Sequence, residues 1–402
     1  MESIKEIFKI GKGPSSSHTM GPKKAAEMFR ELTPEASSYV ITLYGSLAAT
    51  GKGHLTDVAL LETLRDEHKC STEILWKPKE FLPEHPNGMR FQAYDSNGNL
   101  ILEKVYFSIG GGDISETGKR EQNKHIYPDT KMADILAWCN DQNCNFWEYV
   151  AKYEESDIWD FLNERWKVMK AAIERGLDEE GVLPGGLNVR RKAYSYYQHA
   201  KSYQTSMYRR GLMFAYALAV SEENAAGGII VTAPTCGSCG VLPATMNLIH
   251  TCYEYSDKKI LKALATAGLI GSIIKQNASI SGAEVGCQGE VGSACAMASA
   301  AVTQLFGGTT PQVECAASIG MEHFLGLTCD PVCGLVQIPC IERNAFAAAR
   351  VMDATQYSLM SDGRHMVSFD TVIEAMKQTG HDLPSLYKET SEGGLAFLVK
   401  NK

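Results

Sequence analysis

Three cysteines of this chain stand in segments rich in glycine and proline, where loops are expected. They are Cys287 in SGAEVGCQGE, Cys329 in LGLTCDPVCG and Cys340 in QIPCIERN. Such segments adopt the turns that let thiolates converge on a metal or a cluster. The spacing lacks the tight C-x2-C runs of ferredoxins and zinc ribbons. A metal site and a set of small buried apolar side chains are therefore equally good interpretations.

Other thiols compete with these three. Cys236 and Cys239 form a C-x2-C in TAPTCGSCGVLPA, a spacing used by half zinc sites and by redox pairs. No second C-x2-C and no H-x3-H follows it. We therefore interpret this pair as structural or as part of a substrate pocket. Cys333, four residues after Cys329, is a rival metal ligand.

Two segments near the N-terminus combine histidine with glycine and hydroxyl side chains. GKGPSSSHTMGP contains Ser15, Ser16, Ser17, His18 and Thr19, and GSLAATGKGHLTD contains His54. Backbone N–H groups and hydroxyl donors in such a loop can hold a carboxylate or a phosphate. Loops on a rigid scaffold often carry function, although a solvated turn is the simpler interpretation of each segment.

A further polar group precedes the first of the three cysteines. The segment IIKQNASISGAEVGCQGE places Lys275, Asn277 and Ser279 shortly before Cys287, with apolar and small residues on either side. Polar side chains between apolar helices are costly to bury unless a ligand or one another satisfies them. The segment therefore indicates a pocket more than an exposed surface.

Composition restricts the class of protein. A chain of 402 residues predicts two domains. Its formal net charge of -8 comes without the basic stripe that phosphates require, so we expect small-molecule partners and no nucleic acid. The apolar run from Ala263 to Ile274 is too short to cross a bilayer, and MESIKEIFKIGKG lacks a signal-peptide core. We therefore expect no membrane association and a cytoplasmic location, where thiols stay reduced.

The predicted elements change in type near residue 145. Residues 1–144 are typical of a mixed α/β domain, with a helix that opens at Pro22 and an Asn-Gly hairpin turn between two alternating strands. In residues 145–402 the apolar period becomes helical, beginning with a long helix behind a Ser156 cap. Later helices rich in alanine, glycine and serine predict a compact bundle.

Long and uncommon motifs show a resemblance over nearly the whole chain. The first part contains GPSSSHTMGP, YGSLAATGKGHLTD, HPNGM and FSIGGG. The second part contains EGVLPGGLNVRRKA, NASISGAEVGCQGEVGSAC, GMEHFLGLTCDPV, QIPCIERNA and ETSEGGLA. With these motifs the chain resembles the single-chain iron–sulfur L-serine dehydratases, also called L-serine ammonia-lyases.

The resemblance implies a [4Fe-4S] cluster on Cys287, Cys329 and Cys340, with one iron free of protein thiolates. It implies the α+β fold class. The first domain, residues 1–144, would be of the beta type, similar to the substrate-sensing domain of some phosphoglycerate dehydrogenases. The second, residues 145–402, would be the all-α catalytic domain. It also implies a lyase that converts L-serine to pyruvate and ammonia, and a homodimer.

The chemistry of the implied reaction assigns roles to the polar residues. Removing a weakly acidic α-hydrogen while hydroxide leaves needs a base and an electrophile. A positioned base alone supplies about 10²–10⁴-fold, and an open iron can act as the Lewis acid. We expect His18 or His54 to be the base. The other expected site residues are Ser15 and Ser17 in catalysis, and Ser16, Thr19, Lys275, Asn277 and Ser279 in substrate binding.

Other functions stay open at this point. A pyridoxal-phosphate lyase needs a Schiff-base lysine, for which Lys275 is the candidate, and a phosphate cradle. It would leave the three cysteines unused. A non-catalytic amino-acid or redox sensor would bind serine in the first domain. Activity on threonine or cysteine depends on pocket shape, which the sequence does not show.

Overall fold

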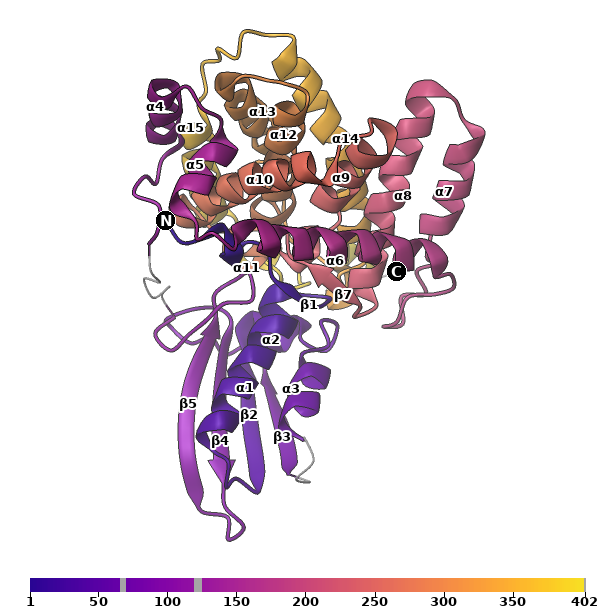
Figure 1. Cartoon of the computed structure of the whole chain (residues 1–402). Coiled ribbons are helices and arrows are strands. Elements are labelled where there is room, and N and C mark those ends of the chain that lie inside the picture. Colours follow the sequence, from indigo (N-terminus) through magenta and orange to yellow (C-terminus); the bar gives the residue numbers. More distant parts are fainter. Residues whose placement is uncertain (66–69, 119–124, 401–402) are drawn as a thin grey trace.

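The chain folds into a helical body with a smaller sheet layer packed below it (Figure 1). The structure is a computed structural model and describes residues 1–65, 70–118 and 125–400. We call the described residues of 16–118 the sheet layer, and the helices that follow residue 131 the helical body. This α+β arrangement agrees with the fold class predicted from the sequence.

The sheet layer is built on a mixed sheet. Its strands are β2 (Ser38–Tyr44), β3 (Ser71–Lys77), β4 (Gly88–Tyr94), β5 (Leu100–Ser108) and β6 (Ile114–Ser115). Within the described residues their order is β3-β2-β4-β5-β6, with β2 and β3 parallel and the other neighbours antiparallel. The predicted hairpin joins β4 to β5. Asp95 closes its turn by accepting hydrogen bonds from the backbone N–H groups of Asn97 and Asn99, both at 2.8 Å.

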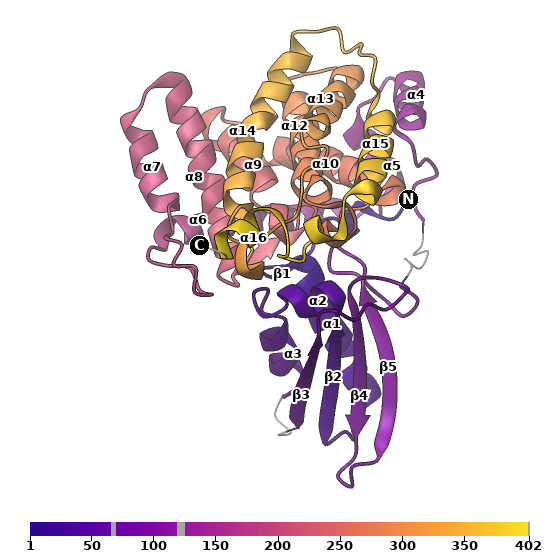
Figure 2. The ribbon, with the colours of Figure 1, turned by 180° about the vertical axis from the view of Figure 1, so that it is seen from behind.

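Helices α1 (Gly21–Leu32) and α3 (Thr56–Leu64) lie on one face of this sheet, the far face in Figure 2, and α2 (Gly45–Thr50) directly follows the end of β2. Pro22 lies in the first turn of α1, as predicted, because its fixed φ and missing N–H suit that position. Phe29 of α1, Leu60 of α3 and the sheet residue Phe91 are fully buried and belong to one apolar core. The sheet layer therefore has its own core.

The N-terminal residues belong to the helical body. Strand β1 (Ile10–Lys12) pairs antiparallel with β7 (Ile229–Val231), and Ile4 and Phe8 are buried in the apolar core of the helices. Lys275 of α10 (Asp257–Asn277) anchors this arrangement through ion pairs with Asp113 at 2.8 Å and with Glu2 at 3.0 Å. The chain therefore starts in the helical body, crosses into the sheet layer and returns. The domain boundary expected near residue 145 stays a prediction.

The helical body surrounds long buried helices, as Figures 1 and 2 show. Its helices are α4 (Met132–Gln142), α5 (Phe146–Tyr153), α6 (Ile158–Asp178), α7 (Ala193–Ser202), α8 (Thr205–Ala225), α9 (Val241–Cys252), α10 (Asp257–Asn277), α11 (Gly282–Val285), α12 (Ser293–Leu305), α13 (Thr310–Glu322), α14 (Cys340–Leu359), α15 (Phe369–Asp382) and α16 (Gly394–Lys400). Helices α10 and α12 are buried over most of their length. Alanine, glycine and serine let their backbones approach closely; at Gly320 on α13, an added Cβ would lie 3.2 Å from a backbone atom of Ala296.

Helix α6 confirms the long helix predicted from its apolar period. Leu162, Trp166 and Ile173 lie on one buried face. The expected Ser156 cap is wrong, because the residue before the first turn is Asp157 and it makes no side-chain cap hydrogen bond. None of the described helices is both long enough and apolar enough to cross a membrane.

Candidate active site

The structure brings Cys287, Cys329 and Cys340 together at the base of the helical body. Cys287 directly precedes the π-helical turn Gln288–Gly292, and Cys340 is the first residue of α14. Cys329 lies in an extended segment whose backbone N–H donates to the Tyr387 carbonyl at 2.8 Å. The Cys329 thiol interacts electrostatically with both other thiols. Segments that are far apart in sequence therefore present three sulfur atoms to one place.

Burial holds these thiols in their neutral form when nothing is bound to them. It raises the pKa of Cys287 to about 11, although the nearby Arg343 guanidinium acts in the opposite direction. Burial and neighbouring acidic groups raise the pKa values of Cys329 and Cys340 well above the ordinary thiol value. Arg343 is held beside them by the Thr328 carbonyl at 2.6 Å. A cationic metal group would reverse this preference, because metal binding deprotonates thiols.

The rival thiols have other surroundings. Cys333 is exposed and has a left-handed backbone with φ 55°, whereas Cys287 and Cys329 are buried. Cys236 is buried with its Sγ 3.5 Å from the Met20 Sδ, and Cys239 is buried near the Glu290 carboxylate. The donor set that best fits an iron–sulfur group is therefore Cys287, Cys329 and Cys340, since soft thiolates from separate loops suit such clusters.

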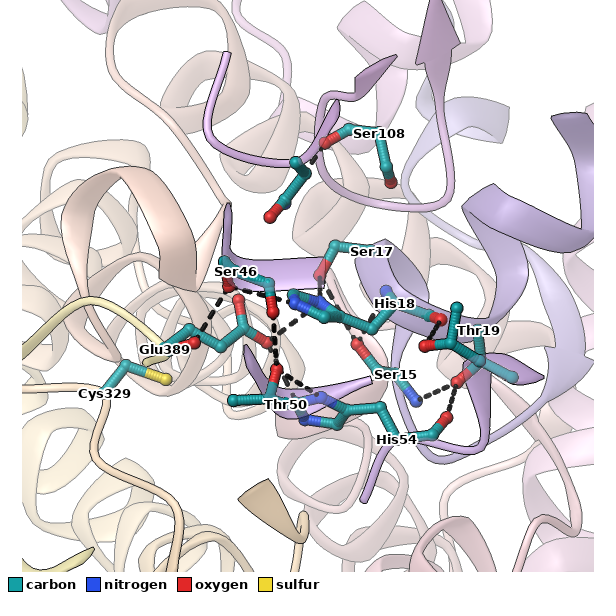
Figure 3. A network of polar contacts seen from close by, with 12 residues as sticks. Ser15, Ser17, His18, Thr19, Ser46, Thr50, His54, Ser108, Cys329 and Glu389 are labelled. Carbon is teal, nitrogen blue, oxygen red and sulfur yellow. Dashed lines mark hydrogen bonds and ion pairs between the residues drawn. The ribbon is translucent and has the colours of Figure 1, made fainter. Parts of the chain in front are cut away.

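A pair of buried histidines from the sheet layer faces this site (Figure 3). His18 lies in the π-helical turn Ser16–Met20, where the sequence predicted a loop, and His54 lies between α2 and α3. Their ring centroids are 4.5 Å apart. His18 Nε2 lies 3.0 Å from the Ser46 hydroxyl, and His54 Nδ1 lies 3.0 Å from the Thr50 hydroxyl. These contacts fix both rings.

Both imidazoles are held neutral. Burial lowers the pKa of His18 to about 3, and it lowers the pKa of His54 well below the ordinary histidine value. The proximity of the two rings adds to the effect for His54, because two positive charges so close together repel each other. A neutral imidazole has a free lone pair, so this pair is in the protonation state that a general base requires.

Glu389 connects the histidines to the thiols. Its Oε1 lies 3.4 Å from His18 Nδ1 and 3.9 Å from His54 Nε2. Its backbone N–H donates to the Cys329 carbonyl at 2.8 Å, and Figure 3 shows the Cys329 sulfur beside it. Its Oε2 is buried without a hydrogen-bond partner among the described residues. Burial raises the pKa of Glu389 well above the ordinary carboxyl value.

The sequence reasoning missed Glu389. Its motif, ETSEGGLA, was noticed only as part of the resemblance, and nothing in its local sequence distinguishes it from a surface glutamate. Ligand atoms of His18, His54 and Glu389 lie within 4.8 Å of one another, so this trio is also a donor set with the geometry of a metal site. The fold alone reveals it.

The hydroxyl residues around His18 mainly hold the two histidine segments in place. The Ser15 hydroxyl accepts from the His18 backbone N–H at 3.0 Å, and the Ser17 hydroxyl lies 2.9 Å from His18 Nδ1. The Thr19 hydroxyl donates to the His54 carbonyl at 2.6 Å. Ser16 is buried in the same turn. All four predicted hydroxyl residues therefore lie at the site.

The remaining predicted residues contact other protein groups. Lys275 is in the buried ion pairs described above, and the Asn277 amide donates to the Thr130 carbonyl at 2.7 Å. The Ser279 hydroxyl donates to Glu284, which in turn contacts His85 Nε2 at 3.1 Å. The contacts to Asp113 and His85 connect the cysteine-bearing segment to the sheet layer.

Two family models match the two parts of the chain that contribute to this site. Residues 3–71 match the serine dehydratase beta chain family, and residues 57–396 match the serine dehydratase alpha chain family. The chain belongs to the serine dehydratase family. The beta-chain match contains His18 and His54, and the alpha-chain match contains the cysteines and Glu389. The histidine–thiol site therefore combines residues from the parts that the two family descriptions cover.

Relatives in this family match over the full length. The chain is 41% identical over 449 residues to an L-serine dehydratase of Streptomyces coelicolor, with 99% of each chain covered. It is 40% identical over 453 residues to L-serine dehydratase 1 of Escherichia coli, with 100% of each covered. It is also 40% identical over 454 residues to the L-serine dehydratase of Mycobacterium tuberculosis, covering 99% of this chain and 98% of the relative.

Proposed function

We propose that the chain is a lyase that converts L-serine to pyruvate and ammonia. The observation that carries this proposal is the placement of two neutral, buried histidines opposite the thiols of Cys287, Cys329 and Cys340, with Glu389 between them. A proton acceptor on one side and a soft metal-ligand set on the other are the parts that elimination of water needs. The names of the full-length relatives support the choice of L-serine.

We propose that Cys287, Cys329 and Cys340 hold a [4Fe-4S] cluster. Their convergence, the burial of Cys287 and Cys329, and the Arg343 guanidinium beside them fit a group that is bound by thiolates. When bound, a cluster with one iron free of protein thiolates supplies a Lewis acid for the substrate hydroxyl. The three thiols would hold that group on the side of the site that the histidines face.

In this proposal the chain's own residues carry the proton chemistry. His54 or His18 removes the α-hydrogen, because both imidazoles are neutral. Ser15 and Ser17 orient His18, and the Ser16–Thr19 turn borders the substrate. Lys275, Asn277 and Ser279 support the segment that leads to Cys287. A cytoplasmic location and a homodimer complete the proposal.

The decisive experiment is purification under argon, followed by iron and acid-labile sulfide analysis and a pyruvate assay. We expect about four irons and four sulfides per chain, and pyruvate formation from L-serine. Parallel assays with threonine and cysteine define the substrate range. Iron-free protein with full activity would refute the cluster. Iron-loaded protein inactive on all three amino acids would refute the lyase.

A pyridoxal-phosphate enzyme fits the site less well. Its Schiff-base candidate, Lys275, is buried with its ammonium group 2.8 Å from an Asp113 oxygen and 3.0 Å from a Glu2 oxygen. Both carboxylates would have to release this nitrogen before it could form an imine. The metal analysis above separates the two chemistries.

A further inference from the structure

The outer face of α14 carries a regular stripe of exposed side chains. We call Phe346, Arg350, Asp353, Tyr357 and Met360 the α14 stripe. They follow one another at intervals of four, three, four and three residues, the spacing of one side of a helix that packs against another helix. Phe346 is 65% exposed, Tyr357 66% and Met360 82%. Large apolar side chains clustered at such exposure mark an interaction surface.

Hollows flank the stripe on both sides. One, of about 360 Å³, lies toward α13 and is lined by His323, Phe324 and Tyr357. The other, of about 380 Å³, lies toward α8 and is lined by Met207 and Met213. Figure 2 shows α14 at the front of the helical body between these neighbours. The stripe is therefore a ridge between two grooves, the shape that interlocks with another ridged surface.

We propose that the α14 stripe is the contact between two copies of this chain, packed antiparallel across a two-fold axis. In such an antiparallel pair, residue i of one helix faces residue j of the partner helix, and the sum i + j is the same number for every facing pair. Arg350 and Asp353 have opposite charges, and their numbers sum to 703. Phe346 and Tyr357 are both aromatic, and their numbers also sum to 703. A single register therefore satisfies the charged pair and the aromatic pair together.

Charge complementarity singles out a second copy as the occupant. Arg350 and Asp353 already lie 3.2 Å apart within one helix. Across the two-fold axis, each faces its opposite in the other chain, so the four charges alternate in sign. Charges of this kind select partner and register, whereas buried aromatic side chains supply most of the affinity.

The test uses the whole chain purified under argon and measures mass by analytical ultracentrifugation. The wild-type chain should sediment at twice its mass of 44.0 kDa. In an Arg350→Glu homodimer, and likewise in an Asp353→Lys homodimer, like charges meet twice. Each should therefore raise the dimer dissociation constant about tenfold or more. Phe346→Glu should raise it roughly 30-fold.

The two charge variants should rescue each other. In a heterodimer of Arg350→Glu and Asp353→Lys chains, both cross-chain pairs are again of opposite charge, although each helix keeps its own like-charge pair. Mixing should therefore restore the dimer. The control is Lys377→Glu on the exposed face of α15, which should leave the mass unchanged.

Several results would overturn the proposal: a wild-type monomer at every concentration, single variants that dimerise like the wild type, or a mixture that stays monomeric. Unaltered circular dichroism of the variants ensures that lost dimer does not reflect lost fold. Because mass is read independently of pyruvate formation, this outcome is separate from that of the proposed lyase activity.

Discussion

The two sides of the site are prepared in different ways. On the histidine side, hydroxyls of Ser17, Ser46 and Thr50 hold His18 and His54 in fixed orientations. On the sulfur side, backbone pairing fixes Cys329, but burial makes the thiolate form of all three cysteines unfavourable. The proton acceptors therefore need no added group, whereas a positively charged metal group would stabilise the thiolate form of the cysteines. The histidine side is therefore preorganised, and the sulfur side depends on its ligand.

The largest effect is expected from variants that change the sulfur side alone. Replacing Cys287, Cys329 or Cys340 by alanine should abolish pyruvate formation and lower the iron content, because each removes one of three thiolates. Iron analysis and activity assays under argon measure both. The matched control is Cys333→Ala, since that thiol is exposed and should be dispensable. Retained iron and activity in one of the three variants would remove that cysteine from the ligand set.

The next largest effect is expected from variants that remove a histidine and leave the three cysteines unchanged. His54→Ala or His18→Ala should lower kcat about 10²–10⁴-fold, the contribution of a positioned base. Iron content and cluster absorbance should not change, because neither ring is proposed as a ligand. His381→Ala is the control, since that side chain is 84% exposed. An unchanged kcat would exclude the replaced histidine from proton transfer.

A smaller effect on activity is expected from a variant of Glu389, the residue that connects the two sides. Glu389→Gln preserves size but removes the titratable carboxyl group, whose Oε1 lies 3.4 Å from His18 Nδ1. Groups that orient a site from outside typically contribute about 10–100-fold. We expect a fall in kcat of that order with iron retained, together with a shifted pH–rate profile. Wild-type kinetics and an unshifted profile would show that Glu389 does not position the histidines.

The smallest effect concerns stability and pH. The folded chain keeps His18 neutral down to a pKa of about 3, whereas the unfolded chain protonates it near pH 6.5. Between these values the unfolded state binds more protons, so the free energy of unfolding falls as pH falls, by about 1.4 kcal/mol per pH unit for each such histidine. Glu389, whose pKa is raised by burial, contributes a slope of the opposite sign, so the test compares variants with the wild type. In denaturant titrations from pH 7 to pH 4.5, the free energy of unfolding of His18→Gln should fall less with falling pH than that of the wild type. His381→Gln should behave like the wild type.

Local features of the sequence predicted much of the fold. The Asn-Gly turn between alternating strands predicted the β4–β5 hairpin, and the apolar period predicted the buried face of α6. The glycine-rich and proline-rich surroundings pointed to Cys287, Cys329 and Cys340, and the loop composition pointed to His18 and His54. These signals succeed because they depend on neighbouring residues and on side-chain chemistry.

What the sequence left undecided depends on contacts between distant residues. The Ser46 hydroxyl donates to the Glu389 carbonyl across 343 residues, and no local pattern encodes that meeting. The β1–β7 pairing and the ion pairs of Lys275 are equally long-range. The sequence by itself determined which side chains are able to accept protons or bind metal. Only tertiary packing decided which of them share a buried space, because burial and proximity shift their pKa values and bring their atoms within reach of one another.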